Sequence, residues 1–207
     1  MTAHTGIRAG ITGGIGTGKT TVCRLFHETF GIPVYYADEW ARRLITEDKQ
    51  LAKQISTQLG EQAYLPDGSY NRAYVASVVF ENPEKLAALN ALVHPAVEKH
   101  SLEWHREQTE AGAPYTLKEA ALLVESGAWK YLDFLIVVTA PETLRIERVM
   151  LRDKITETQV RARMNNQLPE SEKLGKAQAI IQNDGIHDLL RQVTDIHHRI
   201  CVINQKV

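Results

Sequence analysis

The segment that most constrains the fold of this chain is 13–21, which reads GGIGTGKTT. Four of its residues match the phosphate-binding pattern G-x-x-x-x-G-K-[ST], and these are Gly13, Gly18, Lys19 and Thr20. A loop of this kind stands between a buried strand and the first turn of a helix. The apolar run at 7–12 and the helical spacing of apolar residues over 20–30 predict that context, which disfavours a glycine-rich turn with no ligand.

The residue types of this loop suit a bound phosphate. Glycines allow positive φ and leave no Cβ between the backbone and an anion. Successive N–H groups and the positive end of the helix dipole then attract phosphate oxygens. Lys19 adds a mobile charge for the β- and γ-phosphates, and the Thr20 hydroxyl is a hard oxygen ligand suited to Mg²⁺. We expect a nucleoside triphosphate to contact Gly14, Ile15, Gly16, Thr17, Gly18, Lys19, Thr20 and Thr21.

The composition limits the partners of the chain. With 24 basic and 25 acidic residues among 207, the formal net charge is −1, so no global field attracts nucleic acid or an anionic membrane. The sequence has neither an apolar run long enough to span a bilayer nor a signal-peptide pattern. Cys23 and Cys201 form no metal or disulfide pattern, which fits a reducing compartment. We expect a cytoplasmic protein that binds neither nucleic acid nor membrane.

Short apolar segments alternate with helical patterns along the chain. We expect five of them to be strands, at 7–12, 34–36, 115–125, 133–139 and 178–182. The third contains the continuous apolar run AALLV, which is typical of a strand buried on both faces. The alternation predicts an α/β protein with a five-stranded parallel, doubly wound sheet, in which the phosphate loop follows the first strand.

Between the second and third strands, the sequence shows helical patterns and no convincing strand. They include a long helix over 83–110, which we expect to be interrupted or kinked at His94 and Pro95 because proline lacks an N–H. Such an excursion fits either an acceptor-binding subdomain or a plain helical cover on the sheet. We divide the single fold into a core at 1–48, 112–145 and 178–207, a helical insertion at 49–111 and a helical lid at 146–177.

Acidic residues near strand ends are candidates for chemistry. Parallel strands end at one edge of the sheet, so Asp38 and Glu125 would face the same crevice as the phosphate loop. Asp38 could act as a catalytic carboxylate. It could equally cap the helix that follows it, as aspartate often does at such positions. The position of Asp38 in the sequence favours neither interpretation.

Arginines recur at three- and four-residue spacing in the helix that starts near Pro141, and more follow in the next helix. They are Arg145, Arg148, Arg152, Arg161 and Arg163. One interpretation is a solvated face paired with nearby glutamates. The other is a mobile lid, whose guanidinium groups neutralise charge that develops on a transferring phosphoryl group.

Several segments along almost the whole chain together resemble the dephospho-coenzyme A kinases, which belong to the P-loop nucleoside and nucleotide kinases. The matching motifs are GITGGIGTGKT at 10–20, GIPVYYAD at 31–38, Ala41-Arg42, His94-Pro95, LLVESG at 122–127, Ala140-Pro141, Arg148-Val149, Arg152-Asp153, Gln167 with Pro169, and Asn183-Asp184-Gly185. The phosphate loop alone would match many nucleotide-binding proteins. The whole set, in this order and spacing, is specific.

The resemblance implies that ATP, with Mg²⁺, phosphorylates the ribose 3′-hydroxyl of dephospho-coenzyme A, the final step of coenzyme A synthesis. It also implies a P-loop kinase fold made of a nucleotide core, a helical acceptor-binding part and a lid. Asp38 would be the base, and Lys19, Arg148 and Arg152 would stabilise the transition state. Further contacts are implied for the acceptor at Arg42, His94 and Glu125, and for the adenine of ATP at Asn183.

The chain departs from the family pattern after its second strand. The family usually has Asp-Ala-Asp where this chain has Tyr36-Ala37-Asp38, so the first carboxylate is lost. Glu119 is a candidate to replace it beside Thr20 as a ligand of Mg²⁺.

Two other functions stay open. Another small-molecule or nucleotide kinase could use the same core. A slow nucleotide-hydrolysing switch would normally carry an Asn-Lys-x-Asp motif, which this sequence lacks. We expect a monomer or a weak homo-oligomer.

Overall fold

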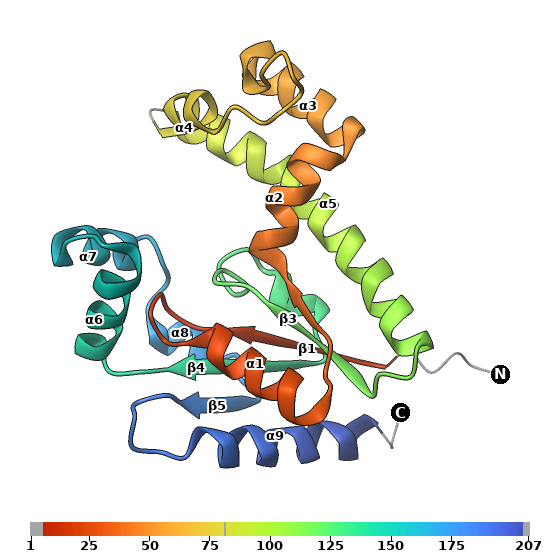
Figure 1. Cartoon of the computed structure of the whole chain (residues 1–207), viewed down its shortest axis with the longest axis vertical. Helices are drawn as coiled ribbons and strands as arrows, with labels where there is room; N and C mark the ends of the chain where they lie inside the picture. Colours follow the sequence, from red (N-terminus) through yellow and green to blue (C-terminus); the bar gives the residue numbers. More distant parts are fainter. Residues whose placement is uncertain (1–5, 81, 205–207) are drawn as a thin grey trace. The chain divides into compact units, whose positions relative to one another are not determined.

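The computed structural model describes residues 6–80 and 82–204 of the chain (Figure 1). Its strands are β1 (Ile7–Thr12), β2 (Val34–Tyr36), β3 (Tyr115–Glu119), β4 (Phe134–Thr139) and β5 (Ala179–Gln182). They form one five-stranded sheet in the order β2-β3-β1-β4-β5, and every pairing is parallel. The predicted five-stranded parallel sheet is therefore confirmed, with β1 and its loop at its centre.

Helices occupy most of the remaining chain. They are α1 (Lys19–Phe30), α2 (Ala37–Glu47), α3 (Lys49–Leu59), α4 (Arg72–Phe80), α5 (Pro83–Glu110), α6 (Glu142–Asp153), α7 (Glu157–Asn165), α8 (Glu170–Leu174) and α9 (Leu189–Asn204), with short 3₁₀ turns at Glu61–Ala63 and Ala128–Tyr131. None of the helices within the described part of the chain is both long enough and apolar enough to span a bilayer.

The chain divides into two compact units. The first comprises 1–36 and 105–207 and contains the whole sheet, and the second comprises 37–104 and contains α2, α3, α4 and most of α5. The finer division into core, insertion and lid stays a prediction.

The main hydrophobic core lies in the first unit, between one face of the sheet and two helices. Apolar residues of α1 and α9 pack there against alternate residues of the central strands. Spacing explains this, because Val22, Cys23 and Phe26 fall on one side of α1 at helical intervals and are fully buried. Gly31 ends α1 with a φ of 66°, a left-handed conformation that glycine adopts readily. This packing fixes the end of the phosphate loop where α1 begins.

The third strand is shorter than the sequence predicted. β3 ends at Glu119, and the apolar run that follows forms turns over 121–126. Ser126 donates its backbone N–H to the Leu122 carbonyl oxygen at 3.0 Å, and Gly127 closes the turn with a φ of 76°. The run is apolar because Leu123, which is 1% exposed, covers the face of β1 at Gly10. The predicted strand over 115–125 was therefore wrong beyond Glu119, and Glu125 lies in a turn.

The long helix α5 runs from Pro83 to Glu110 with Pro95 inside it. The helix is therefore not interrupted at His94 and Pro95, and the alternative, a kink there, stays a prediction. A proline removes one backbone donor from the helix, and the hydrogen bonds on either side suffice to continue it.

Candidate active site around the phosphate loop

The loop between β1 and α1 has the backbone conformation that its glycines permit. Gly16 and Gly18 have φ values of 81° and 86°, which side-chain-bearing residues rarely adopt. Thr17 tightens the turn, because both its backbone N–H and its hydroxyl donate to the Gly14 carbonyl, at 3.3 and 2.9 Å. A Cβ on Gly13 would collide with the Val138 carbonyl oxygen of β4, so that position also has no room for a side chain.

Backbone carbonyl groups of the loop position the Lys19 ammonium. Lys19 donates from Nζ to the carbonyl oxygens of Gly13 and Gly14, at 3.0 and 3.4 Å. These bonds hold the ammonium beside the loop. The first turn of α1, which the structure describes in full, contains no acidic residue. The helix dipole therefore adds to an attractive site for an anion.

Side chains from the far half of the chain hold the outer side of the loop. Arg145 of α6 donates from Nε to the Ile15 carbonyl oxygen at 3.0 Å. Arg148 donates from Nη1 to the carbonyl oxygens of Asn183 and Gly16, at 3.1 and 3.5 Å. The Asn183 amide donates to the Thr17 carbonyl oxygen at 2.8 Å. Arg148 and Asn183, which the sequence placed near ATP, thus both contact the loop.

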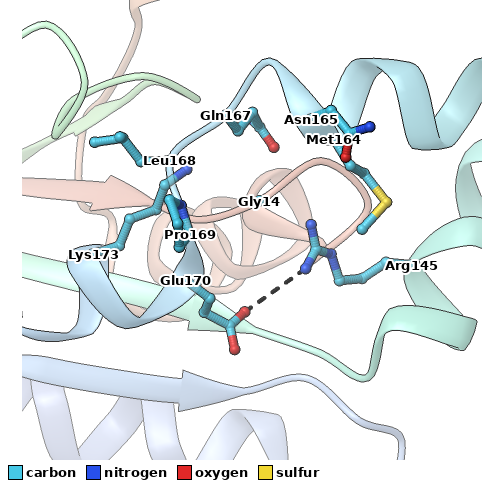
Figure 2. A pocket seen from close by; sticks show the side chains of 9 residues that line it. All are labelled: Gly14, Arg145, Met164, Asn165, Gln167, Leu168, Pro169, Glu170 and Lys173. Carbon is cyan, nitrogen blue, oxygen red and sulfur yellow. Dashed lines mark ion pairs between the residues drawn. The ribbon is translucent and has the colours of Figure 1, made fainter.

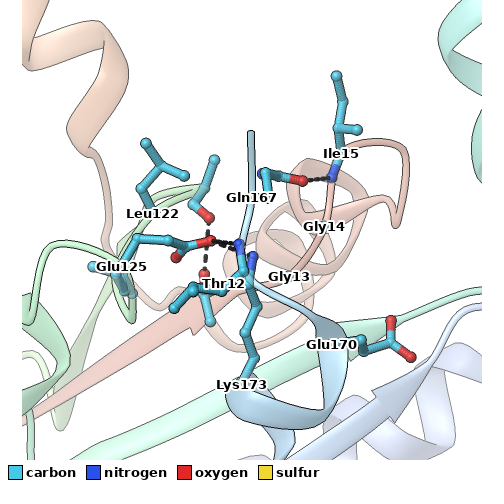
Figure 3. Close-up of polar contacts among 12 residues, drawn as sticks. Thr12, Gly13, Gly14, Ile15, Leu122, Glu125, Gln167, Glu170 and Lys173 are labelled. Carbon is cyan, nitrogen blue, oxygen red and sulfur yellow. Dashed lines mark hydrogen bonds and ion pairs between the residues drawn. The ribbon is translucent and has the colours of Figure 1, made fainter. Parts of the chain in front are cut away.

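A second set of contacts joins the loop region to the segment before and within α8 (Figure 3). The Ile15 N–H donates to Gln167 Oε1 at 2.8 Å. Lys173 Nζ lies 2.6 Å from Glu125 Oε1, and the Leu168 N–H donates to that same oxygen at 3.2 Å. The Lys173 side chain is 1% exposed, so this ion pair is buried. Glu125 Oε2 is also buried, and no described residue gives it a hydrogen bond.

The remaining arginines of α6 and α7 pair with carboxylates. Arg152 and Arg163 both bind Asp153 at 2.7 Å, and Arg161 lies 2.6 Å from Glu142. The hydrogen bond from Arg152, with a further one from Arg163, holds the pKa of Asp153 below its usual range. The arginines that the sequence grouped together are therefore divided between the phosphate loop and the surface.

Three predicted site residues belong to the second unit. Asp38 is the second residue of α2 and is exposed, and Arg42 lies one turn further along the same face of that helix. The Asp38 carboxylate accepts no hydrogen bond from any residue that the structure describes, so it does not cap α2. His94 is exposed on α5.

Glu119 and Tyr36 stand in register on neighbouring strands. Tyr36 packs against the main hydrophobic core, which explains how a ring is accommodated where the family has a carboxylate. Glu119 is 8% exposed. The pKa of the Cys23 thiol is raised by burial first and then by the charge of Glu119, whereas Lys19 lowers it. Glu119 and Lys19 therefore act on the same buried part of α1.

Two cavities adjoin Arg145 and Glu170, whose charged groups approach to 3.9 Å (Figure 2). One, of about 510 Å³, is lined by residues of the phosphate loop, α6, the end of α7, the segment after it and α8, among them Gly14, Gln167 and Lys173. The other, of about 560 Å³, is lined by Thr139, Pro141 and Asp184 among others, next to Asn183. The described residues contain no group of three His, Cys, Asp or Glu side chains that could hold a metal ion.

The predicted site residues did not include Arg145 and Gln167, which bind Ile15 of the phosphate loop, or Lys173, which binds Glu125. The sequence held a signal for two of them, because Arg145 belongs to the arginine row and Gln167 to the family motifs. Lys173 had none, since its partner Glu125 is distant in the sequence.

The comparisons with known proteins agree with this geometry. A family model described as dephospho-CoA kinase matches residues 7–188. A dephospho-CoA kinase of Salinibacter ruber is 39% identical over 91% of this chain and 94% of its own length. A Thermus thermophilus crystal structure covers 94% of this chain and 97% of its own at 33% identity, with a TM-score of 0.79. A dephospho-CoA kinase structure from Campylobacter jejuni covers 95% and 98%, at 26% identity and a TM-score of 0.70. The chain therefore belongs to the dephospho-CoA kinase family and has its P-loop kinase fold.

Proposed function

We propose that this protein transfers the γ-phosphoryl group of ATP to the ribose 3′-hydroxyl of dephospho-CoA and so produces CoA. Family membership supports both substrates. The observation that carries the donor half is the phosphate loop, where Gly16 and Gly18 have positive φ and Lys19 Nζ donates to the carbonyl oxygens of Gly13 and Gly14.

Phosphoryl transfer depends mainly on positioning and on charge stabilisation. In the proposed mechanism, the Asp38 carboxylate orients the acceptor hydroxyl and takes its proton. The bond from this oxygen to the γ-phosphorus forms as the bond to the β–γ bridging oxygen breaks, and ADP leaves. Lys19, Arg148 and Arg152 balance the negative charge on the transferring group. The absence of a hydrogen-bonded partner for Asp38 among the described residues supports its role as base.

Mg²⁺ is the metal that we propose for the reaction, and the residues present fit it. The Thr20 hydroxyl is exposed at the start of α1, and Glu119 is a carboxylate whose charge acts on the same helix. A site with so few protein ligands suits Mg²⁺, which usually keeps waters and binds the substrate phosphates. When bound, the ion would neutralise part of the negative charge on the phosphates.

The remaining contacts are proposed from the family. Arg42, His94 and Glu125 would bind the acceptor, and Glu125 Oε2 is the oxygen that its bonds to Lys173 and Leu168 leave unused. Asn183 would lie near the adenine, beside the cavity that Asp184 and Thr139 line. We further propose a cytoplasmic protein that is a monomer or a weak homo-oligomer, with no nucleic acid or membrane partner.

A coupled assay for ADP release tests the function. The purified protein is given ATP and Mg²⁺ with dephospho-CoA, and in parallel with nucleoside monophosphates or shikimate. Turnover confined to dephospho-CoA is expected, with formation of CoA verified by mass. Preferred turnover of another acceptor would support a different kinase on this core. ADP release that does not depend on any acceptor would indicate a slow hydrolase.

A further inference from the structure

Three successive carbonyl groups of the phosphate loop, those of Ile15, Gly16 and Thr17, accept hydrogen bonds from side chains outside the loop. The donors are Arg145 for Ile15, Arg148 for Gly16 and the Asn183 amide for Thr17. The bonds of Arg145 and Asn183 are the shorter ones, at 3.0 and 2.8 Å. These two donors therefore act on the first and the last of the three peptide groups.

Because the peptide group is planar, these bonds also determine the direction in which the following N–H groups point. In a trans peptide, the carbonyl oxygen and the following N–H point in opposite directions. A bond that draws the Ile15 carbonyl toward Arg145 therefore turns the Gly16 N–H away from α6. By the same argument, the bond from Asn183 to Thr17 turns the Gly18 N–H away from the turn after β5. Neither N–H has a hydrogen-bond partner among the described residues, so both remain donors for an anion.

The close approach of these donors depends on the glycines. A Cβ on Gly14 would collide with the Arg145 guanidinium, and a Cβ on Gly18 would collide with the Asn183 amide. A Cβ on Gly16 would stand 2.5 Å from the carbonyl oxygen of Arg145 itself. The absence of side chains at these glycines thus has two effects. It leaves the inner side of the loop open to phosphate, and it lets the outer donors approach the backbone.

Arg145 is the better placed of the two donors for a dedicated role. Its side chain is 12% exposed, and the Glu170 carboxylate lies 3.9 Å from its guanidinium group. The residue that it binds is also held on its other side, because the Ile15 N–H, which belongs to the preceding peptide group, donates to Gln167. Ile15 is therefore held through both its backbone groups, and one of them is held by a charged donor, which forms the stronger kind of hydrogen bond.

We propose that Arg145 is a positioning residue, with Asn183 as its counterpart, that sets the orientation of the Gly16 and Gly18 N–H groups before nucleotide binds. It acts through the peptide of Ile15 and not by contact with substrate. The proposal rests on the proposed function only in that polyphosphate is the ligand of the loop. It predicts a selective loss of polyphosphate affinity when the donor to Ile15 is removed.

The test compares Arg145→Met, Arg145→Lys and Arg161→Met. Arg161→Met is the matched control, because it removes the same charge from an exposed arginine on α7. Two readouts are taken, namely the ¹⁵N amide shifts of Gly16 and Gly18 without ligand, and the affinity for inorganic tripolyphosphate by calorimetry. We expect Arg145→Met to shift the Gly16 amide most and to weaken tripolyphosphate binding roughly tenfold, the usual scale for one charge-assisted hydrogen bond. Arg145→Lys keeps one donor and should lie in between.

Each result decides something. Unchanged Gly16 shifts with wild-type affinity in Arg145→Met would overturn the positioning role. A lower melting temperature without loss of affinity would also overturn it, because it would reduce Arg145 to a packing residue. If Arg145→Met does not fold, Arg145→Lys decides, and wild-type behaviour of its Gly16 amide and affinity would contradict the proposal. Failure of the wild-type protein to bind tripolyphosphate would instead count against the proposed function.

Discussion

Two groups of basic side chains in the first unit differ in what they bind. Lys19, Arg145 and Arg148 donate to backbone carbonyls of the phosphate loop and of the turn after β5. On the outer side of α6 and α7, Arg152 and Arg161 bind carboxylates. A carbonyl fixes a cation in place without cancelling its charge, whereas a carboxylate cancels it. The bonds to carbonyl groups thus hold the cations of the inner group beside the loop, where a polyphosphate would bind.

The largest expected effect concerns the inner group. Lys19→Ala should abolish ATP-dependent formation of product, with a loss of at least about a hundredfold in rate, because Lys19 would supply the mobile charge for the β- and γ-phosphates. The coupled assay measures the rate, and a circular dichroism melt checks the fold. Lys130→Ala, at an exposed position, is the control for loss of one lysine. Wild-type turnover in Lys19→Ala would refute the phosphate site.

The next largest effect is expected for Asp38, a negatively charged residue of the proposed site. Asp38→Asn should lower kcat by about a hundredfold, the scale for a positioned base, and leave the affinity for ATP almost unchanged. Glu39→Gln removes a charge from the neighbouring exposed residue of α2 and should have little effect. If Asp38→Asn instead lowers only the melting temperature, the carboxylate stabilises the helix and is not the base.

Arg148 and Arg152 lie one turn apart on α6, but Arg148 binds backbone carbonyls and Arg152 binds a carboxylate. They therefore allow the two groups to be compared within one helix. Removal of either charge should slow phosphoryl transfer in single-turnover measurements. Arg148→Met should slow it more than Arg152→Met, because Arg152 is already paired with Asp153 at 2.7 Å. Equal losses would mean that the bond to Asp153 breaks during the reaction and that the division into two groups does not hold for catalysis. An unchanged rate in both variants would mean that neither arginine takes part in phosphoryl transfer, which favours the alternative of a solvated helix face.

The smallest expected effect is the pH dependence of the outer group. The folded pKa of Asp153 is lowered, so its contribution to stability is present above the ordinary carboxyl pKa and is lost as pH falls through the lowered value. Asp153→Asn should lower the melting temperature slightly at pH 7, since the group is largely solvent-screened. The difference from wild type should shrink in strongly acidic solution. A constant difference across that range would mean that Asp153 stabilises the protein by some other means.

The sequence predicted the parts of the site that depend on local order. The loop, its strand and α1 followed from a motif within one short segment, and the order of strands and helices followed from apolar periodicity. The end of β3 was not predictable in this way, because an apolar run that folds back over Gly10 has the same composition as a buried strand. The bonds of Arg145 to Ile15 and of Lys173 to Glu125 join distant parts of the chain, so they arise from tertiary packing alone.

The side chain of Ile15 has a consequence of its own. It packs against the small cluster of Ile146, Val149 and Val160, which forms the interior of α6 and α7. The phosphate loop and these two helices therefore share one hydrophobic cluster, and such clusters tend to open as a cooperative unit. A ligand that orders the loop should then also slow hydrogen exchange of amides in α6 and α7 that it never touches. Binding of nucleotide to the loop would thus raise the local stability of α6 and α7.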